Sequence, residues 1–395
     1  MIRVFPAGRE APSGRRPHFM SLELLDKHSP TRISSGPGSL LQLGELAVEY
    51  GGSRVLVVSD SGVVSAGHTQ LGMNSISAVG LAVELYDGVE ENPTTAHVLQ
   101  GLEIARQFEP DLLVGLGGGS AMDCAKGINF VYSCGGEISD YRGVGKATAA
   151  MLPMIAVPTT SGTGSETQSF ALISDKDTHQ KMACGDKRAT FKAAILDPLT
   201  TTTQPLQVTA ATGIDAVSHA VESYVTRKRT ELSMELSLGA WQLLSGSFKS
   251  VLESPDDIEA RAAMQLGASL AGLAIENSML GAAHSAANPL TAHYGIVHGA
   301  AVALVLPAVV RFNSRVCGDD YGRLAGDDEG GGEALAVRLE EFRKLSGLPQ
   351  RLSDCKVKQE DIALMSSEAA GQWTAQFNPE DTTPGVFSEI YRGVF

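Results

Sequence analysis

The chain has 395 residues, 43% of them hydrophobic, and a formal net charge of −14. This length and apolar content can fill two ordinary cores, so two domains are expected. The acidic balance argues against nucleic acid as a partner, because a phosphate backbone binds to a basic face. It does not exclude a small anionic ligand held in a local pocket.

The sequence contains no run of 18 apolar residues, so no membrane partner is expected. Its five cysteines, odd in number and without any C-x-x-C pairing, are typical of a reduced, cytoplasmic protein. The first residues carry arginines among proline and glycine and lack the apolar block of a signal peptide. We expect residues 1–30 to be a partly disordered leader.

Five short apolar segments in the first half are predicted to be strands of a parallel sheet. They are rich in β-branched residues and end at polar turns, as strands buried on both faces do. The segments cover residues 54–60, 83–86, 111–116, 154–158 and 193–198. Ligands of such sheets bind beyond the carboxyl ends of the strands, so the polar residues at these ends are candidates for binding.

Glycine-rich loops follow two of these strands. The segment 117–120, Gly-Gly-Gly-Ser, lies between a strand and a predicted helix over 121–130. Exposed backbone N–H groups at such a helix start suit a pyrophosphate, although the pattern is not the usual G-x-G-x-x-G. A second loop, 159–166, is rich in threonine, serine and glycine. Together the loops indicate a dinucleotide, with ordinary connecting loops as the alternative.

Asp60 stands at the carboxyl end of the first of these strands. An acidic residue there commonly accepts from ribose hydroxyls and repels a 2′-phosphate. The alternative is a turn-forming aspartate.

Beyond residues 200–205, with their threonine run and proline, the composition turns helical. Segments 208–225, 231–250 and 258–276 have helical periodicity, and no second set of strands alternates with them. We therefore expect an N-terminal nucleotide-binding α/β domain over 31–203 and an all-helical domain over 204–395 that closes a cleft against it.

Asp215 and His219 are spaced four residues apart in a predicted helix, so both side chains project from one face. Such a pair can hold one cation, but it is more often a hydrogen-bonded helix pair. A metal needs further ligands, and His284 and His298 are the downstream candidates. One carboxylate and three imidazoles suit iron(II), zinc or a similar divalent ion.

In combination and order, several segments resemble the iron-containing (group III) alcohol dehydrogenases over nearly the whole chain, from about Ser34 to Phe395. The matching parts are Asn92-Pro93-Thr94, Gly117-Gly118-Gly119-Ser120-Ala121-Met122-Asp123, the loop 158–166, the helix segment 213–219, His284 and His298. The resemblance implies a Rossmann-like parallel-sheet domain followed by an all-helical metal-binding domain, which is a dehydroquinate synthase-like fold.

The resemblance also implies an activity: NAD(P)-linked hydride transfer between a small alcohol and its aldehyde or ketone, with a divalent metal, iron(II) or else zinc, as Lewis acid. The implied metal ligands and catalytic residues are Asp215, His219, His284 and His298. The implied cofactor-binding residues are Asp60, Asn92, Gly118, Gly119, Ser120, Asp123, Thr159, Thr160 and Lys181. Asp60 favours NAD over NADP, and the family suggests a homodimer or a larger homo-oligomer.

One departure from the family concerns the group that would transfer the proton of the alcohol. Many members carry a histidine four residues after the third ligand, where this chain has Asn288. An amide cannot shuttle a proton by titrating. We expect proton transfer through water or the cofactor ribose, with His293 as an outside candidate.

Other readings stay open at this point. Within the fold, these are a glycerol dehydrogenase-like or dehydroquinate synthase-like enzyme, and a reductase of an anionic aldehyde or keto acid of the phosphonoacetaldehyde or maleylacetate type. The basic residues Arg227, Lys228 and Arg229 could line an anion pocket, or else form a solvated helix end. A non-catalytic nucleotide-binding protein is the alternative from another class.

Overall fold

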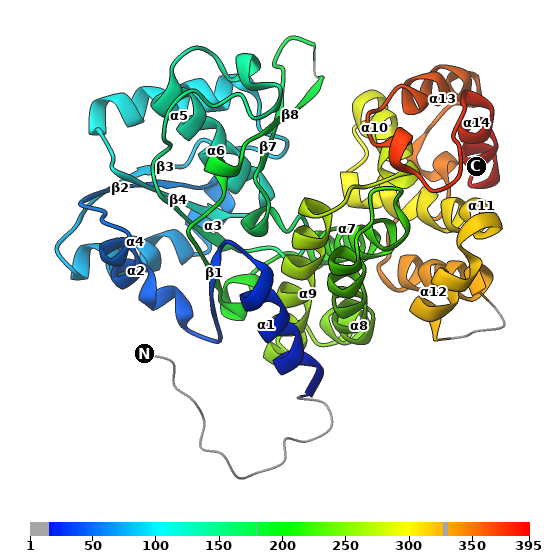
Figure 1. The fold of residues 1–395 in the computed structure, drawn as a ribbon, viewed down its shortest axis with the longest axis horizontal. Helices are drawn as coiled ribbons and strands as arrows, with labels where there is room; N and C mark the ends of the chain where they lie inside the picture. The colour runs from blue at the N-terminus through cyan, green and yellow to red at the C-terminus, as the bar shows by residue number, and fades with distance from the viewer. Residues whose placement is uncertain (1–15, 179, 327–330) are drawn as a thin grey trace.

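The computed structural model describes residues 16–178, 180–326 and 331–395. The chain first forms a lobe built around a sheet and then a lobe of helices, side by side in Figure 1. This is the predicted order of a parallel-sheet half and an all-helical half. The last strand ends at Leu196, and the first long helix of the second lobe begins at Leu206.

The central sheet has six parallel strands in the order β1-β9-β6-β4-β2-β3. The strands are β1 (Arg32–Ser35), β2 (Arg54–Val58), β3 (Ala82–Tyr86), β4 (Leu112–Gly117), β6 (Met154–Pro158) and β9 (Ala193–Leu196). Strands β4 and β6 are buried along their whole length, which explains their continuous apolar sequence. All five predicted strands are therefore present in this sheet.

Helices cover both faces of the sheet. Alternate residues of β2 show this directly, because Leu56 and Val58 belong to one apolar core while Val55 and Val57 belong to the other. The first core contains residues of α5 (Thr95–Phe108) and α6 (Gly119–Cys134), and the second contains residues of α2 (Leu43–Glu49) and α4 (His68–Ala78). The short helix α3 (Ser61–Ser65) follows β2 directly.

Four strands were not predicted. β1 is a short, polar edge strand in a segment that reads as turns. A second sheet joins β5 (Gly143–Val144), β8 (Lys181–Gly185) and β7 (Phe170–Ser174), with β7 and β8 antiparallel. This small sheet matters for the site, because β8 carries Lys181.

The second lobe is helical. Its helices are α7 (Leu206–Val225), α8 (Glu231–Glu253), α9 (Ile258–Glu276), α10 (Ala282–Tyr294), α11 (His298–Ala325), α12 (Gly331–Leu345), α13 (Ile362–Ala370) and α14 (Pro384–Gly393). Short 3-10 turns lie between the longer elements in both lobes: η1 (Ser39–Gln42), η2 (Ile138–Tyr141), η3 (Ser165–Thr167), η4 (Lys187–Ala189), η5 (Pro198–Thr201), η6 (Leu352–Cys355), η7 (Gln359–Asp361) and η8 (Ala375–Phe377).

Helices α7 and α11 form the centre of this lobe. Every residue of α7 from Gly213 to Val225 is buried, and α7 packs against α8, α9 and α11. By length and composition α11 could cross a membrane, but 67% of its apolar window lies inside the protein, as in the core helix of a soluble protein. The helical core therefore accounts for its hydrophobicity.

Part of the predicted leader over residues 1–30 is ordered. Residues Arg16–His28 form helix α1, which packs on α8 and α9. Leu25 is fully buried in the helical core, and Leu22 and Leu24 pack against it. These leucines give the segment an apolar face that the arginine-rich start of the sequence obscured. Residues 1–15 lie outside the described residues.

Candidate active site

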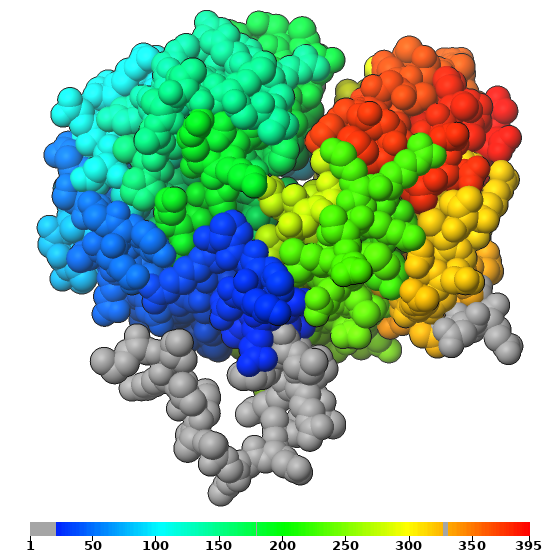
Figure 2. Space-filling model, viewed as in Figure 1, coloured from blue at the N-terminus to red at the C-terminus, as the bar shows by residue number. Residues whose placement is uncertain are grey.

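A deep cleft of about 1220 Å³ lies between the two lobes. Figure 2 shows the notch between the green and the red-orange parts of the surface. Residues from both halves of the chain line it, from Asp60 after β2 to Cys355 in η6. All nine predicted cofactor-binding residues and all four predicted metal ligands are among the lining residues.

The glycine-rich loop forms one wall of the cleft. Strand β4 ends at Gly117, whose φ of +157° favours glycine, and Gly118 is the N-cap of α6. A Cβ on Gly119 would lie 2.5 Å from the side chain of Thr163, so these two glycine-containing loops touch where a side chain would not fit. The first N–H groups of a helix have no partner within the helix, and here they face a cleft large enough for a dinucleotide. The predicted pyrophosphate site therefore fits the observed backbone.

Asp60 forms a helix cap and also lines the cleft, and its contact with a ribose stays a prediction. It is the N-cap of α3, and its Oδ1 accepts hydrogen bonds from Gly62 N at 2.9 Å and Val63 N at 3.0 Å. The same side chain lines the cleft, and its Oδ2 lies toward Gly117 of the neighbouring strand end. The cap fixes the carboxylate at the sheet edge.

Asp123 has a structural role that sequence reasoning did not assign. Its carboxylate accepts from Ser165 Oγ at 2.6 Å and from Leu172 N at 3.1 Å, and it lies 3.7 Å from Lys126 Nζ. Burial raises the pKa of Asp123, and Lys126 lowers it in part. These contacts tie α6 to the second loop and to β7. Contact of Asp123 with the cofactor stays a prediction.

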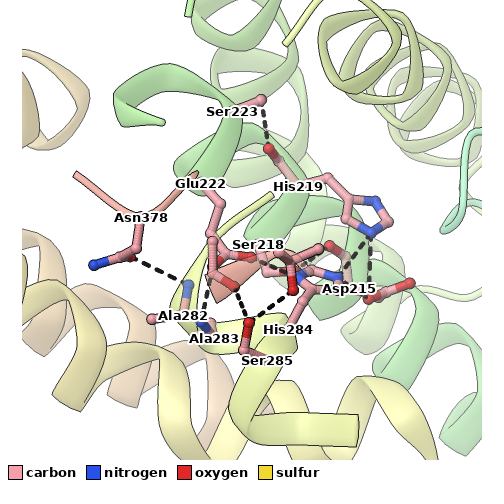
Figure 3. Close-up of polar contacts among 12 residues, drawn as sticks. Asp215, Ser218, His219, Glu222, Ser223, Ala282, Ala283, His284, Ser285 and Asn378 are labelled. Carbon is pink, nitrogen blue, oxygen red and sulfur yellow. Dashed lines mark hydrogen bonds and ion pairs between the residues drawn. The ribbon is translucent and has the colours of Figure 1, made fainter. Parts of the chain in front are cut away.

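The four candidate metal ligands meet at the helical side of the cleft. Asp215 and His219 come from α7, His284 from α10 and His298 from the start of α11. Asp215 Oδ1 is 3.5 Å from the Nε2 atoms of His219 and His284 and 3.9 Å from that of His298. The Nε2 atoms of His219 and His284 are 3.1 Å apart. Figure 3 shows three of the four side chains converging.

The charges of this cluster favour a cation. Burial alone would raise the pKa of Asp215, but the three histidines hold it well below its usual range. Burial lowers the pKa of His298 to about 3, although Asp215 opposes this shift. Burial also lowers the pKa of His219. A carboxylate thus remains ionised beside the neutral imidazoles of His219 and His298, which are the forms that ligate metals. The pKa of His284 is raised to about 9, so this histidine must release its Nε2 proton when an ion binds.

The spacing of the donors fits one metal ion. Ligands about 2.1 Å from a tetrahedral ion are about 3.4 Å from one another. The separations from Asp215 to the three histidines and between His219 and His284 are close to this, at 3.1 to 3.9 Å. Asp215, His284 and His298 each offer a ligand atom within 4.8 Å of the other two, and His219 joins them through its contacts with Asp215 and His284. Asp215 Oδ1 is buried and has no hydrogen-bond partner among the described residues. Three imidazole nitrogens surround this oxygen at 3.5 to 3.9 Å without a hydrogen bond, and a cation at the centre would bind it directly.

Sequence reasoning missed Glu222, which lies on α7 behind the cluster. Its Oε2 pairs with His284 Nδ1, and its Oε1 accepts from Ala283 N at 2.8 Å. Burial alone would lower the pKa of His284, but Glu222 and Asp215 together raise it to about 9. The position of Glu222, three residues after His219 on the same helix face, is the sequence signal that could have revealed it.

Asn288 and His293, the two residues discussed for proton transfer, do not line the cleft. Asn288 donates from Nδ2 to Gln372 Oε1 at 3.1 Å, and His293 Nε2 is 2.7 Å from Glu368 Oε2. Neither is among the described residues that line the cleft. The structure therefore does not support His293 as a proton donor, and transfer through water or ribose stays a prediction.

The basic segment 227–229 also lies outside the lining of the cleft. Arg227 pairs with Asp381, Arg229 pairs with Asp320, and Lys228 lies over the ring of Phe377. Each cation thus has its own partner on the surface, and none contributes to an anion pocket in the cleft.

Comparison with known proteins supplies the family. Residues 30–198 match the family model described as iron-containing alcohol dehydrogenase, and residues 209–395 match its C-terminal model. The chain is 32% identical to the NAD-dependent methanol dehydrogenase of Bacillus methanolicus, covering 90% of this chain and 96% of that one. It is 35% identical to alcohol dehydrogenase 4 of Schizosaccharomyces pombe, with 90% and 86% covered.

Solved structures agree with this assignment. A 1,3-propanediol oxidoreductase superposes with a TM-score of 0.90 at 30% identity, covering 93% of this chain and 98% of that one. This match confirms the predicted dehydroquinate synthase-like fold. The chain therefore belongs to the family of iron-containing alcohol dehydrogenases and is an oxidoreductase that acts on CH–OH groups.

Proposed function

We propose that this enzyme interconverts a short, neutral primary alcohol and its aldehyde, with NAD as the hydride carrier and iron(II) as the metal. The observation that carries the proposal is the shared cleft. The four metal donors and the glycine-rich start of α6 open into one cavity, so a nicotinamide and a metal site can face the same substrate. The name of the Bacillus relative, an NAD-dependent methanol dehydrogenase, supports the same chemistry.

The chain's own residues have three tasks in this reaction. Asp215, His219, His284 and His298 hold the metal, which when bound supplies a Lewis acid next to the substrate oxygen. The loops after β4 and β6 bind the pyrophosphate and so orient the nicotinamide. The helical lobe forms the other wall of the cleft, which places the substrate between the metal donors and the nicotinamide. Oxidation of the alcohol then yields aldehyde, NADH and one proton.

The charges in the cleft favour a neutral substrate over an anionic one. Among the described residues that line the cleft, Lys181 is the one lysine or arginine, against five carboxylates: Asp60, Glu90, Glu91, Asp123 and Asp215. Lys181 itself is neighboured by Asp123, Asp215 and Glu91. Apart from the metal, an anionic aldehyde would find no lysine or arginine here that is free of neighbouring carboxylates among the described residues. Near the metal donors, Leu280 and Val297 offer apolar walls.

A substrate panel tests this proposal. Protein purified without chelator is assayed for NADH oxidation with short neutral aldehydes and with phosphonoacetaldehyde and maleylacetate. We expect one metal ion per chain and a kcat/KM at least about tenfold higher for the best neutral aldehyde, a difference of about 1.4 kcal/mol. A preference for the anionic compounds would contradict the neutral assignment. No turnover after anaerobic iron(II) reconstitution would contradict the dehydrogenase itself.

Replacing Asp60 with asparagine is expected to relax the preference for NAD. Asparagine caps a helix as well as aspartate does, so Asp60→Asn keeps α3 intact while it removes the charge that would repel a 2′-phosphate. We expect the ratio of kcat/KM for NADPH to that for NADH to rise about tenfold. Asp60→Ala is the contrasting variant, because it also loses the cap, at a cost of about 1 kcal/mol of stability. An unchanged ratio in Asp60→Asn would show that another residue selects the cofactor.

The remaining parts of the proposal concern the metal and the assembly. A set of one carboxylate and three imidazoles also accepts zinc, so elemental analysis decides between iron and zinc. A homodimer or larger homo-oligomer and a cytoplasmic location remain predictions. Light scattering of the purified enzyme tests the first of these.

A further inference from the structure

Glu222 is a buried carboxylate that the proposed reaction does not use. It lies on α7, seven residues after Asp215 and three after His219, and is 5% exposed. Its two oxygens have separate partners at the start of α10. Oε2 pairs with Nδ1 of His284, and Oε1 accepts the backbone N–H of Ala283 at 2.8 Å. Figure 3 shows Glu222 between α7 and the start of α10.

This pairing decides which nitrogen of His284 can bind a metal. A histidine that donates Nδ1–H to a carboxylate keeps its lone pair on Nε2. In the structure, Nε2 of His284 is the atom that faces Asp215 Oδ1, at 3.5 Å, and His219 Nε2, at 3.1 Å. Glu222 thus stands on the opposite side of the ring from the site where the donors converge.

The carboxylate is itself held in place. A Cβ on Gly281 would lie 3.2 Å from Glu222 Oε1, so glycine leaves room for the carboxylate against the start of α10. Next to it, Asn378 Oδ1 accepts from Ala282 N at 3.2 Å and from Asn313 Nδ2 at 3.0 Å. The start of α10 is therefore anchored by two buried acceptors from other segments, and only Glu222 also reaches the imidazole.

We infer that Glu222 is the positioning residue of the metal centre: it fixes the orientation and tautomer of His284 so that Nε2 is presented to the ion. The inference rests on the proposed metal site. It assigns Glu222 no contact with substrate or cofactor. Groups of this kind behind a metal ligand typically contribute a factor of about 10 to 100 in metal affinity.

The test uses Glu222→Gln, which keeps the size of the side chain. Its amide can accept from only one of the two donors, so either Ala283 N–H or His284 Nδ1–H loses its acceptor. The control is Glu276→Gln. Glu276 also accepts from a backbone N–H and a hydroxyl, those of Ser169, at 3.0 and 2.7 Å, but it touches none of the four donors.

Zinc affinity is measured for each full-length, metal-free protein by competition with a chromophoric chelator, together with the thermal midpoint of the metal-free form. We expect the Kd for Zn²⁺ to rise about 10- to 100-fold in Glu222→Gln and to stay within about twofold of the wild type in Glu276→Gln. The visible spectrum of bound Co²⁺ should change in the first variant alone. An unchanged Kd and Co²⁺ spectrum in Glu222→Gln would overturn the inference.

A second variant covers the case in which Glu222→Gln does not fold. Glu222→Asp keeps the charge but withdraws the carboxylate by one methylene, and we expect it to weaken zinc binding about tenfold. Wild-type affinity in that variant would likewise overturn the inference. Because the readout is metal binding, it is independent of the substrate. A wild-type chain that binds no metal at all would refute the proposed function instead.

Discussion

Gly299→Ala is expected to disable the metal centre although it replaces none of the proposed metal ligands. Gly299 follows His298 at the start of α11, and a Cβ there would lie 2.0 Å from the backbone oxygen of Ala211 on α7. Since α7 also carries Asp215 and His219, the two helices must separate and draw His298 away from the other donors. Overpacking against buried backbone costs about 3 kcal/mol, and a displacement of about 1 Å reduces turnover about 10²-fold.

The matched control is Gly246→Ala in α8. Gly246 is exposed in the middle of a helix and has no atom within 4 Å of an added Cβ. This change should stabilise the protein by up to about 1 kcal/mol and leave activity unchanged. Metal content, turnover and the thermal midpoint are measured for both variants. Full metal content in Gly299→Ala would mean that the approach of α7 and α11 does not set the geometry of the site.

His284→Ala is expected to abolish turnover. The change removes the donor that lies 3.1 Å from His219 and 3.5 Å from Asp215, so three donors remain for the ion. Loss of the metal's contribution, about 4 kcal/mol, corresponds to a decrease of about 10³-fold or more in kcat/KM. NADH binding, followed by fluorescence titration, should be retained because the glycine-rich loop is unaltered.

His293→Ala provides the control for this variant. His293 is a histidine of the same helix, α10, paired with Glu368 on the surface. An exposed ion pair contributes about 0 to 1 kcal/mol, so this change should be nearly silent in both stability and turnover. A large loss of activity in His293→Ala would revive it as a proton donor. Wild-type turnover in His284→Ala would contradict the ligand assignment.

Much of the fold could be predicted because its signals are local. Strands such as β4 and β6 are buried on both faces, so their sequences are continuously apolar. Helix α9 has the predicted ends, Ile258 and Glu276, since its amphipathic pattern is long and regular. By contrast, β1 and the β7–β8 hairpin are short. Strand β1 pairs with the distant strand β9, and β8 pairs with the distant strand β5. Helix α1 depends in the same way on apolar contacts with the distant helices α8 and α9.

The site residues show the same difference between local sequence patterns and long-range contacts. The i, i+4 spacing of Asp215 and His219 and the glycine loop after β4 are local patterns, and both lie in the cleft. The spacing after His219 places Glu222 on the same helix face, but its partner His284 is 62 positions away, so the pairing itself has no local pattern. The same holds for Asp123, whose partner Ser165 is 42 positions away, and for the surface pairs that occupy Arg227 and Arg229. Long-range packing therefore decides which of the candidate polar residues face the cleft.

The most direct test is an anaerobic titration of the metal-free, full-length enzyme with Fe²⁺, in which NADH oxidation by a short neutral aldehyde is measured at each addition. If Asp215, His219, His284 and His298 hold one catalytic ion, turnover rises linearly from near zero and stops rising at about one equivalent per chain. Turnover that is already maximal before iron is added, with no metal detectable in the protein, would contradict a metal-dependent dehydrogenase.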